Sequence, residues 1–150
     1  MDSGTLLSSF NTVANEFIDK MILAYPYEPK LKICKTVYLA TKKYNNKKPL
    51  EFFMSTLLPY GEEILRRNEH FFRQDDMVDQ AQTFTGQTGL INYWEQMTPE
   101  NKSYVWEYIQ TLYILGMKIL GKEDELGQLM GKLNNVTNQG TNQGTNQGTQ

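Results

Sequence analysis

The segment TPENKSYVWEYIQTLYILGMKILG, from Thr98 to Gly121, decides the fold of this chain. It starts with a hydroxyl side chain that can cap a helix, a proline at the first helical position and an acid in the first turn. It ends at a glycine, the residue type that commonly follows the last helical residue. Apolar residues cover about half of its circumference, so we expect a helix central to a bundle or covered by a partner. These residues are Tyr104, Val105, Trp106, Tyr108, Ile109, Leu112, Tyr113, Leu115 and Ile119, and Ile114 falls on the polar side.

Further helices are expected on both sides of this segment. Leu6 to Tyr25 has apolar residues at three-to-four spacing and is stopped by Pro26. A second run covers Pro29 to Tyr44, and a last short helix covers Glu123 to Leu133. Phe17 is expected to be largely buried, together with Trp106 and Leu112 of the central segment. When the second run is drawn on a helical wheel at about 100° per residue, one half of the helix circumference holds its apolar residues. These are Leu31, Cys34, Val37, Tyr38, Ala40 and Tyr44.

A third run, from Pro49 to Phe72, contains Pro59 in its middle. Its apolar spacing of four and three continues across this proline, which favours a kinked continuous helix over two separate helices, and both remain open. A polar, Gly/Thr-rich stretch over 73–89 is expected to be a loop, and a short fourth helix is expected over 88–97.

The whole pattern predicts an all-α bundle of five to six helices in one domain over residues 1–133. The length of 150 residues, with 39% hydrophobic and 21% charged residues, suits one globular domain. From 134 to 150 the chain repeats Thr-Asn-Gln-Gly without charges, so it cannot bury enough apolar surface to order itself. We therefore expect a disordered tail over 134–150.

Lysines are concentrated in one part of the chain, although its net charge is only −2. Seven lysines lie within nineteen residues that contain no acid, and the other 8 basic and 17 acidic residues leave −9. This segregation predicts an oriented encounter with an anionic partner. A solvated face or a protein contact is favoured over nucleic acid, because Tyr38 and Tyr44 are expected to face the core rather than stack on bases. The predicted surface, called the lysine cluster below, consists of Lys32, Lys35, Lys42, Lys43, Lys47 and Lys48.

Catalytic and metal-binding patterns are weak. Asp75-Asp76-Met77-Val78-Asp79 matches the magnesium-binding motif of isoprenoid synthases, but no second acidic motif accompanies it, so a solvated acidic loop is preferred. The one cysteine, Cys34, is expected to be a buried thiol, and the one histidine, His70, has no nucleophile at a recognisable spacing. We therefore expect no enzyme activity, no cofactor and no metal site.

Hydropathy and the N-terminus bear on location. No apolar run reaches the roughly 18–20 residues that span a bilayer, so no membrane span is expected. The start Met1-Asp2-Ser3-Gly4 lacks the basic residues of a signal peptide, so secretion is not expected.

Two stretches together resemble a known group of proteins. The first joins PLEFF (49–53) to ILRRNEHFF (64–72) and closes on Asp75-Asp76. The second joins Trp94 to TPENK (98–102) and VWEYIQTL (105–112). This pattern resembles small helical proteins of giant nucleocytoplasmic DNA viruses and covers about residues 49–121. The tail is not part of it.

The resemblance implies a viral origin and an all-helical fold, and it carries over no catalytic residue. From it we expect a non-enzymatic structural or protein-interaction protein, which includes a minor virion component. Its expected partners are viral proteins, and its expected location is the virion or the host cytoplasm or nucleus. The alternative is an intracellular nucleic-acid-binding module that uses the lysine cluster for weak contacts. The sequence leaves the oligomeric state open.

Overall fold

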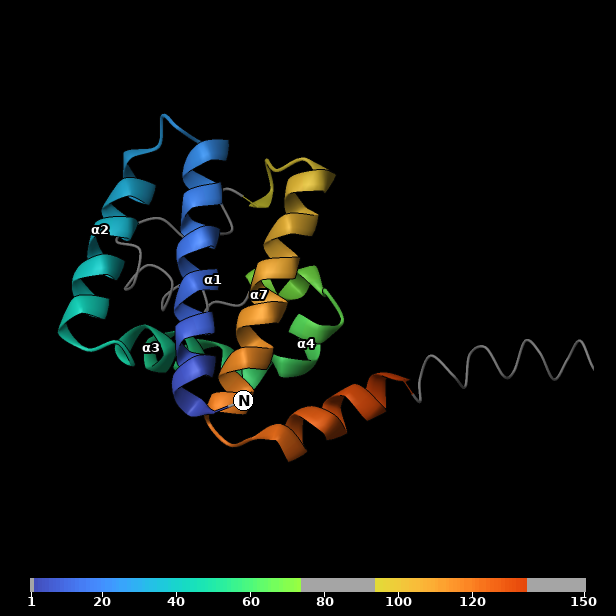
Figure 1. Cartoon of the computed structure of the whole chain (residues 1–150). Helices are drawn as coiled ribbons and strands as arrows, with labels where there is room; N and C mark the ends of the chain where they lie inside the picture. Colours follow the sequence, from blue (N-terminus) through green and yellow to red (C-terminus); the bar gives the residue numbers. More distant parts are fainter. Residues whose placement is uncertain (1, 74–93, 135–150) are drawn as a thin grey trace, which may run out of the picture.

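The computed structural model describes residues 2–73 and 94–134, and within these ranges the chain is helical and forms no strand (Figure 1). This confirms the predicted all-α fold. The last helix of the described chain, which Figure 1 draws without a label, covers residues 123–134. The elements are α1 (Ser3–Ala24), α2 (Pro29–Tyr44), α3 (Lys48–Leu57), the 3-10 turn η1 (Leu58–Tyr60), α4 (Gly61–Leu65), the 3-10 turn η2 (Glu69–Arg73) and α7 (Pro99–Ile119).

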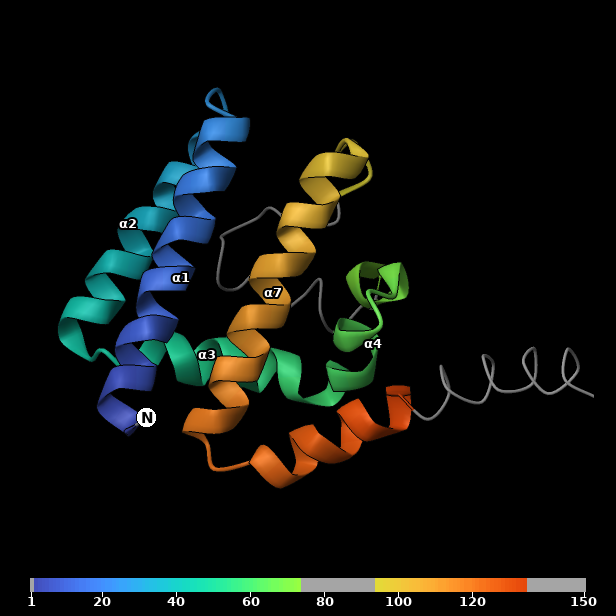
Figure 2. The same ribbon diagram turned by 45° about the vertical axis from the view of Figure 1, so that its right-hand side comes forward.

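Helix α7 is central, as its wide apolar surface predicts. It packs against α1, α3 and α4, and Figure 2 shows it running between α1 and α4. Its start is capped by Thr98, whose side chain accepts a hydrogen bond from the backbone N of Asn101 at 3.2 Å. Its end is followed by Gly121 at φ +73°, a left-handed conformation that glycine adopts without a steric penalty. The chain then turns into the 123–134 helix.

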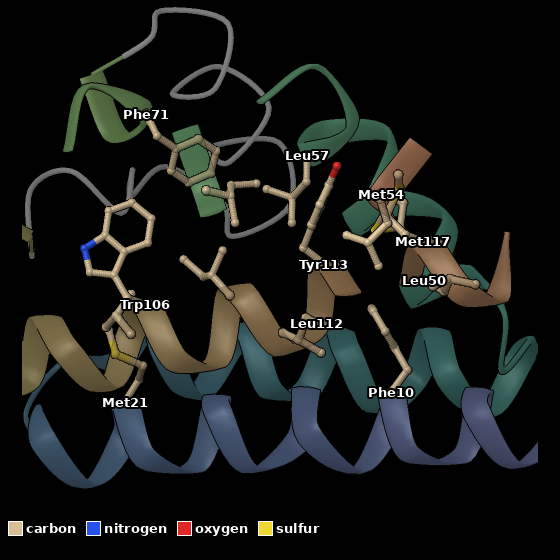
Figure 3. Close-up of a cluster of buried hydrophobic side chains, with 14 of the residues drawn as sticks. Phe10, Met21, Leu50, Met54, Leu57, Phe71, Trp106, Leu112, Tyr113 and Met117 are labelled. Atoms are coloured by element: carbon tan, nitrogen blue, oxygen red, sulfur yellow. The ribbon is translucent and has the colours of Figure 1, made fainter. Parts of the chain in front are cut away.

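The core forms where α1 and α3 meet α7. Figure 3 shows one cluster of buried side chains, most of them from these helices. Phe17 lies at the edge of this cluster and is only half-buried, with its ring stacked on Tyr108 at 5.2 Å between centroids. The labelled members are Phe10 and Met21 of α1, Leu50, Met54 and Leu57 of α3, Phe71 of η2, and Trp106, Leu112, Tyr113 and Met117 of α7.

The third predicted run is interrupted at its proline and ends early. Helix α3 ends at Leu57, and the 3-10 turn that contains Pro59 joins it to α4, whose N-cap Tyr60 has a non-helical backbone. The run is therefore two helical segments joined at the proline, with buried residues on both sides of it, rather than one continuous helix. Helix α4 ends at Leu65 and does not reach Phe72, because Arg67 adopts a left-handed φ of 54°. Gln110 of α7 stabilises this end: its side-chain amide donates to the carbonyls of Ile64 and Leu65 at 3.1 and 3.3 Å.

One residue on the predicted polar side of α7 is covered. Ile114 was expected on the polar side of α7, yet it is half-buried and packs against the core, and α4 also packs against α7. The 123–134 helix is anchored by the buried Leu126 and by an ion pair between Lys132 and Glu62 at 3.6 Å. The expected loop over 73–89 and fourth helix over 88–97 lie mostly outside the described residues. The tail expected over 134–150 also lies outside them, except residue 134, which belongs to the last helix.

Candidate protein-interaction surface

Helix α2 carries most of the lysine cluster, and local sequence signals define its ends. Pro29 occupies the first turn, and the Glu28 carboxylate accepts a hydrogen bond from the backbone N of Lys30 at 3.1 Å. Lys42 and Lys43 lie in the last turn, where cations interact favourably with the helix dipole. The observed bounds, Pro29–Tyr44, match the predicted ones.

One narrow side of α2 is buried. Cys34 and Tyr38 are its buried residues, and the Tyr38 hydroxyl donates to the backbone carbonyl of Asn11 on α1 at 2.8 Å. The main contacts of α2 are with α1 and α3, and both views show it at one edge of the bundle (Figures 1 and 2). Most of its circumference is therefore left uncovered.

The structure splits the lysine cluster into three environments. Lys35 and Lys42 are half-buried, and Lys35 forms an ion pair with Asp19 of α1. Lys32 and Lys43 are exposed on the outer side of α2. Lys47 and Lys48 belong to the start of α3, where Lys48 pairs with Glu51 at 3.4 Å. The lysine cluster therefore does not form one continuous face. Four of its six lysines lie on α2, and the other two lie at the start of α3.

Positive charge on α2 is largely uncompensated. The helix contains five lysines and no acid. Within the described part of the chain, Lys30, Lys32, Lys42 and Lys43 form no ion pair. Such a surface produces a local positive potential that attracts anionic groups.

An exposed apolar row lies beside these lysines, and the sequence interpretation missed it. Ile33 is 55% exposed, Val37 42% and Tyr44 88%, and Ala40 between them is also exposed. The expectation that Tyr44 faces the core is therefore wrong, and Val37 and Ala40, which share its half of the helical wheel, are exposed as well. A helix at the edge of a bundle contacts its neighbours along a narrow stripe, and α2 buries too little of its surface to cover them. We call Ile33, Val37, Ala40 and Tyr44 the outer row.

A sequence signal for the outer row does exist. Its residues follow one another at spacings of four, three and four, which aligns them along one side of a helix. The wheel shows two neighbouring apolar stripes on α2, and the spacing alone does not tell which stripe meets the core. Only the contacts with α1 and α3 decide that Cys34 and Tyr38 are buried.

The structure describes two of the residues that were considered as catalytic candidates, Cys34 and His70. Burial raises the pKa of the Cys34 thiol to about 11, so at neutral pH it is a protonated packing group rather than a nucleophile. His70 is exposed in η2. The acidic motif over 75–79 lies outside the described residues. Among the residues the structure describes, no group of three or more His, Cys, Asp or Glu side chains is arranged to hold a metal ion.

Three aromatic residues of the stretches that carry the resemblance meet in one cluster. Trp94 packs edge-to-face on Trp106 at 5.5 Å, and Phe71 lies 6.2 Å from the same ring. The Glu69 carboxylate accepts hydrogen bonds from the Trp94 indole at 3.2 Å and from the Lys102 ammonium at 3.3 Å. These residues therefore join η2 to the start of α7. Their contacts are those of a packing unit.

A comparison with protein-family models found no match, and comparisons with curated proteins and with solved structures found none of significance. In the described ranges, no helix combines the length and the apolar character needed to cross a bilayer.

Proposed function

We propose that this chain is a non-catalytic protein-interaction domain whose partner docks on the outer side of α2. The observation that carries the proposal is the exposed outer row on α2, whose main contacts among the described residues are with α1 and α3. Single exposed apolar residues are ordinary, whereas a contiguous group of them, bordered by polar residues, is typical of interaction sites.

The neighbouring lysines support the same proposal. Uncompensated charge at the rim of an apolar contact steers a partner into the correct orientation and excludes partners of like charge. Lys30, Lys32 and Lys43 are placed to do this beside the outer row.

We further propose a viral setting, with the domain as a minor virion component. The resemblance of residues 49–121 to helical proteins of giant DNA viruses supports this setting. Mass spectrometry of purified virions tests it: detection at a fixed stoichiometry is the expected result, and absence from the particle would move the protein to the infected cell.

Site-specific photo-crosslinking tests the interaction itself. A photoreactive phenylalanine analogue replaces Val37 in the full chain, which is produced in cells where the protein naturally occurs. A matched control places the analogue at Met130, which is similarly exposed at 40% but lies on the 123–134 helix, away from α2 in both views. We expect a discrete protein adduct from position 37 only, and its loss when Ile33 is changed to Ser. Equal labelling from both positions, or no adduct from position 37, would contradict the proposal.

Nucleic-acid binding is the second candidate, and the unpaired lysines of α2 favour it. Four phosphate contacts to a duplex predict a slope of about −3.6 in a plot of log affinity against log salt. We expect only weak binding, because the rest of the chain carries −9. A salt series of fluorescence anisotropy with single- and double-stranded oligonucleotides measures it. A dissociation constant below about micromolar at physiological salt, tighter than ordinary non-specific binding, would place this function first.

A further inference from the structure

The outer row has the geometry of one side of a helix pair. Its residues are spaced by four, three and four positions, the spacing of the apolar seam between two packed helices. From Ile33 to Tyr44 the row is about 16 Å long, at about 1.5 Å per residue. This length corresponds to three turns of a partner helix. Tyr44 at its end offers a large amphipathic ring, the kind of side chain that often anchors an interface.

The charges beside the row define the chemistry of the partner. On the helical wheel Lys30 borders the row on one side, and Lys32 and Lys43 border it on the other. Since α2 contains no acid, nothing on the helix itself compensates these charges. A helix that presents Asp or Glu beside its own apolar row would pair with lysines on both sides, as flanking charges do in coiled coils.

The same charges disfavour a symmetric contact between two copies of α2. In a two-fold interface each patch meets itself, so the lysine rows of the two copies would face one another. Like charges opposed across an interface cost free energy and select against that pairing. The outer row therefore fits a different surface better than a second α2.

A lipid surface fits less well. Helices that lie in a membrane interface carry a broad apolar face with Trp, Phe or Leu. On α2 the side with Cys34 and Tyr38 is buried in the bundle, and the outer row is a single line that includes the small Ala40. A nucleic acid would contact the lysines and leave the apolar row without a role.

From these observations we propose that α2 binds an amphipathic helix with an apolar row and acidic flanks, supplied by another protein. This inference rests on the proposed function and specifies its partner. Ile33, Val37, Ala40 and Tyr44 form the apolar contact, and Lys30, Lys32 and Lys43 select the acidic flanks and fix the orientation.

Designed peptides test this inference on the full chain. The probe is a monomeric, helix-stapled peptide with leucines at four-three spacing and glutamates on both flanks. The control peptide keeps the leucines and replaces every glutamate with lysine. Fluorescence anisotropy measures affinity, and NMR chemical-shift changes locate the site. We expect the acidic peptide to shift resonances of residues 30–44, to bind at least about tenfold more tightly than the control, and to weaken with added salt.

Matched variants distinguish a specific contact with the outer row from nonspecific hydrophobic binding. Val37→Ser removes a member of the row, and Leu39→Ser removes a similarly exposed leucine, 45% exposed, that lies off the row among the lysines. We expect Val37→Ser to weaken the acidic peptide about five- to tenfold, the loss typical of an interface contact, and Leu39→Ser to leave it unchanged. Circular dichroism verifies that both variants keep their helices.

Several results would overturn the inference: no binding of the acidic peptide, equal binding of both peptides, or equal effects of the two variants. Binding to vesicles of anionic phospholipid that exceeds peptide binding and requires Val37 would favour a membrane surface instead. A protein adduct from position 37 without peptide binding would overturn only the acidic-helix inference. Peptide binding without an adduct would support the binding of an acidic amphipathic helix by α2. It would contradict the proposal that a cellular protein docks there.

Discussion

The thioether of Met54 lies directly over the backbone of Gly116, so that a β-carbon at position 116 would stand 2.3 Å from the Met54 sulfur. Both residues are buried. This contact is where α3 crosses α7, and the absence of a side chain at position 116 lets the two helices approach closely. A glycine inside a helix ordinarily costs about 1 kcal/mol relative to alanine, so the close approach gives a physical reason for this one.

Gly116→Ala should therefore destabilise the protein, although alanine is the better helix former. Overpacking a core costs about 1–3 kcal/mol, which outweighs the gain in helix propensity of about 1 kcal/mol. Urea unfolding measures the change in the free energy of unfolding. Gly127→Ala is the matched control, because a β-carbon there meets nothing within 4 Å, and it should be neutral or stabilising.

A double-mutant cycle identifies the cause. In a Met54→Ala background the clashing side chain is gone, so Gly116→Ala should no longer destabilise. If it costs the same in both backgrounds, the contact with Met54 is not the reason.

Leu112→Ala tests the placement of the core. Leu112 is 1% exposed within the α1–α3–α7 cluster, and truncating a buried leucine typically costs about 2–5 kcal/mol. Leu120 is 41% exposed just past the end of the same helix, and its change to Ala should stay within about 0.5 kcal/mol. Chemical denaturation of the two variants gives the comparison. Similar costs would show that the buried face of α7 is assigned wrongly.

Gln110 holds the end of α4 through its side-chain amide, and its removal should act locally. Gln110→Ala removes the donor to the carbonyls of Ile64 and Leu65, at a cost of about 0.5–1.5 kcal/mol, because the Ile64 carbonyl keeps its bond from the backbone N of Arg67. Gln110→Glu retains an acceptor for Arg67 but cannot donate, so it should be no better than alanine. Hydrogen exchange should accelerate at residues 61–68 in both variants and stay unchanged in α1. Full protection in the glutamate variant would contradict the role of the donated bonds.

How far the sequence predicts this structure depends on how local the signals are. The caps of α7 at Thr98 and Gly121, and the bounds of α2, follow from residue types within one helical turn, and they were predicted correctly. The hydrogen bonds that hold the end of α4 come from Gln110, more than forty residues away, and the approach of Met54 to Gly116 depends on how two helices cross. Neither has a local signal.

The candidate surface shows the same division. The lysines of α2 were identified from the sequence alone, but the separation of Lys35, which is paired, from its unpaired neighbours depends on Asp19 of α1. Tyr44 of the outer row was assigned to the core because both apolar stripes of α2 have helical spacing. Periodicity predicts which residues share a face, and only tertiary contacts decide which face is covered.

The buried thiol of Cys34 makes a prediction about alkaline pH. Burial raises its pKa from the ordinary 9.0 to about 11. Between these two values the unfolded chain loses the thiol proton while the folded chain keeps it, so the folded state is penalised as pH rises. Stability from this group is intact below about pH 9 and falls by up to about 1.4 kcal/mol per pH unit until the folded pKa is reached.

Cys34→Ala isolates this effect. Burial also raises the pKa values of Tyr38 and Tyr113, and they add a slope of the same sign above pH 10 in both proteins. The comparison is therefore between slopes: from pH 9 to 11 the free energy of unfolding should decrease more steeply in the wild type than in the variant. Urea unfolding at a series of pH values measures both curves. Parallel curves would mean that the thiol ionises equally in the folded and unfolded chains, and Cys34 would then have to be accessible rather than packed between α2 and its neighbours.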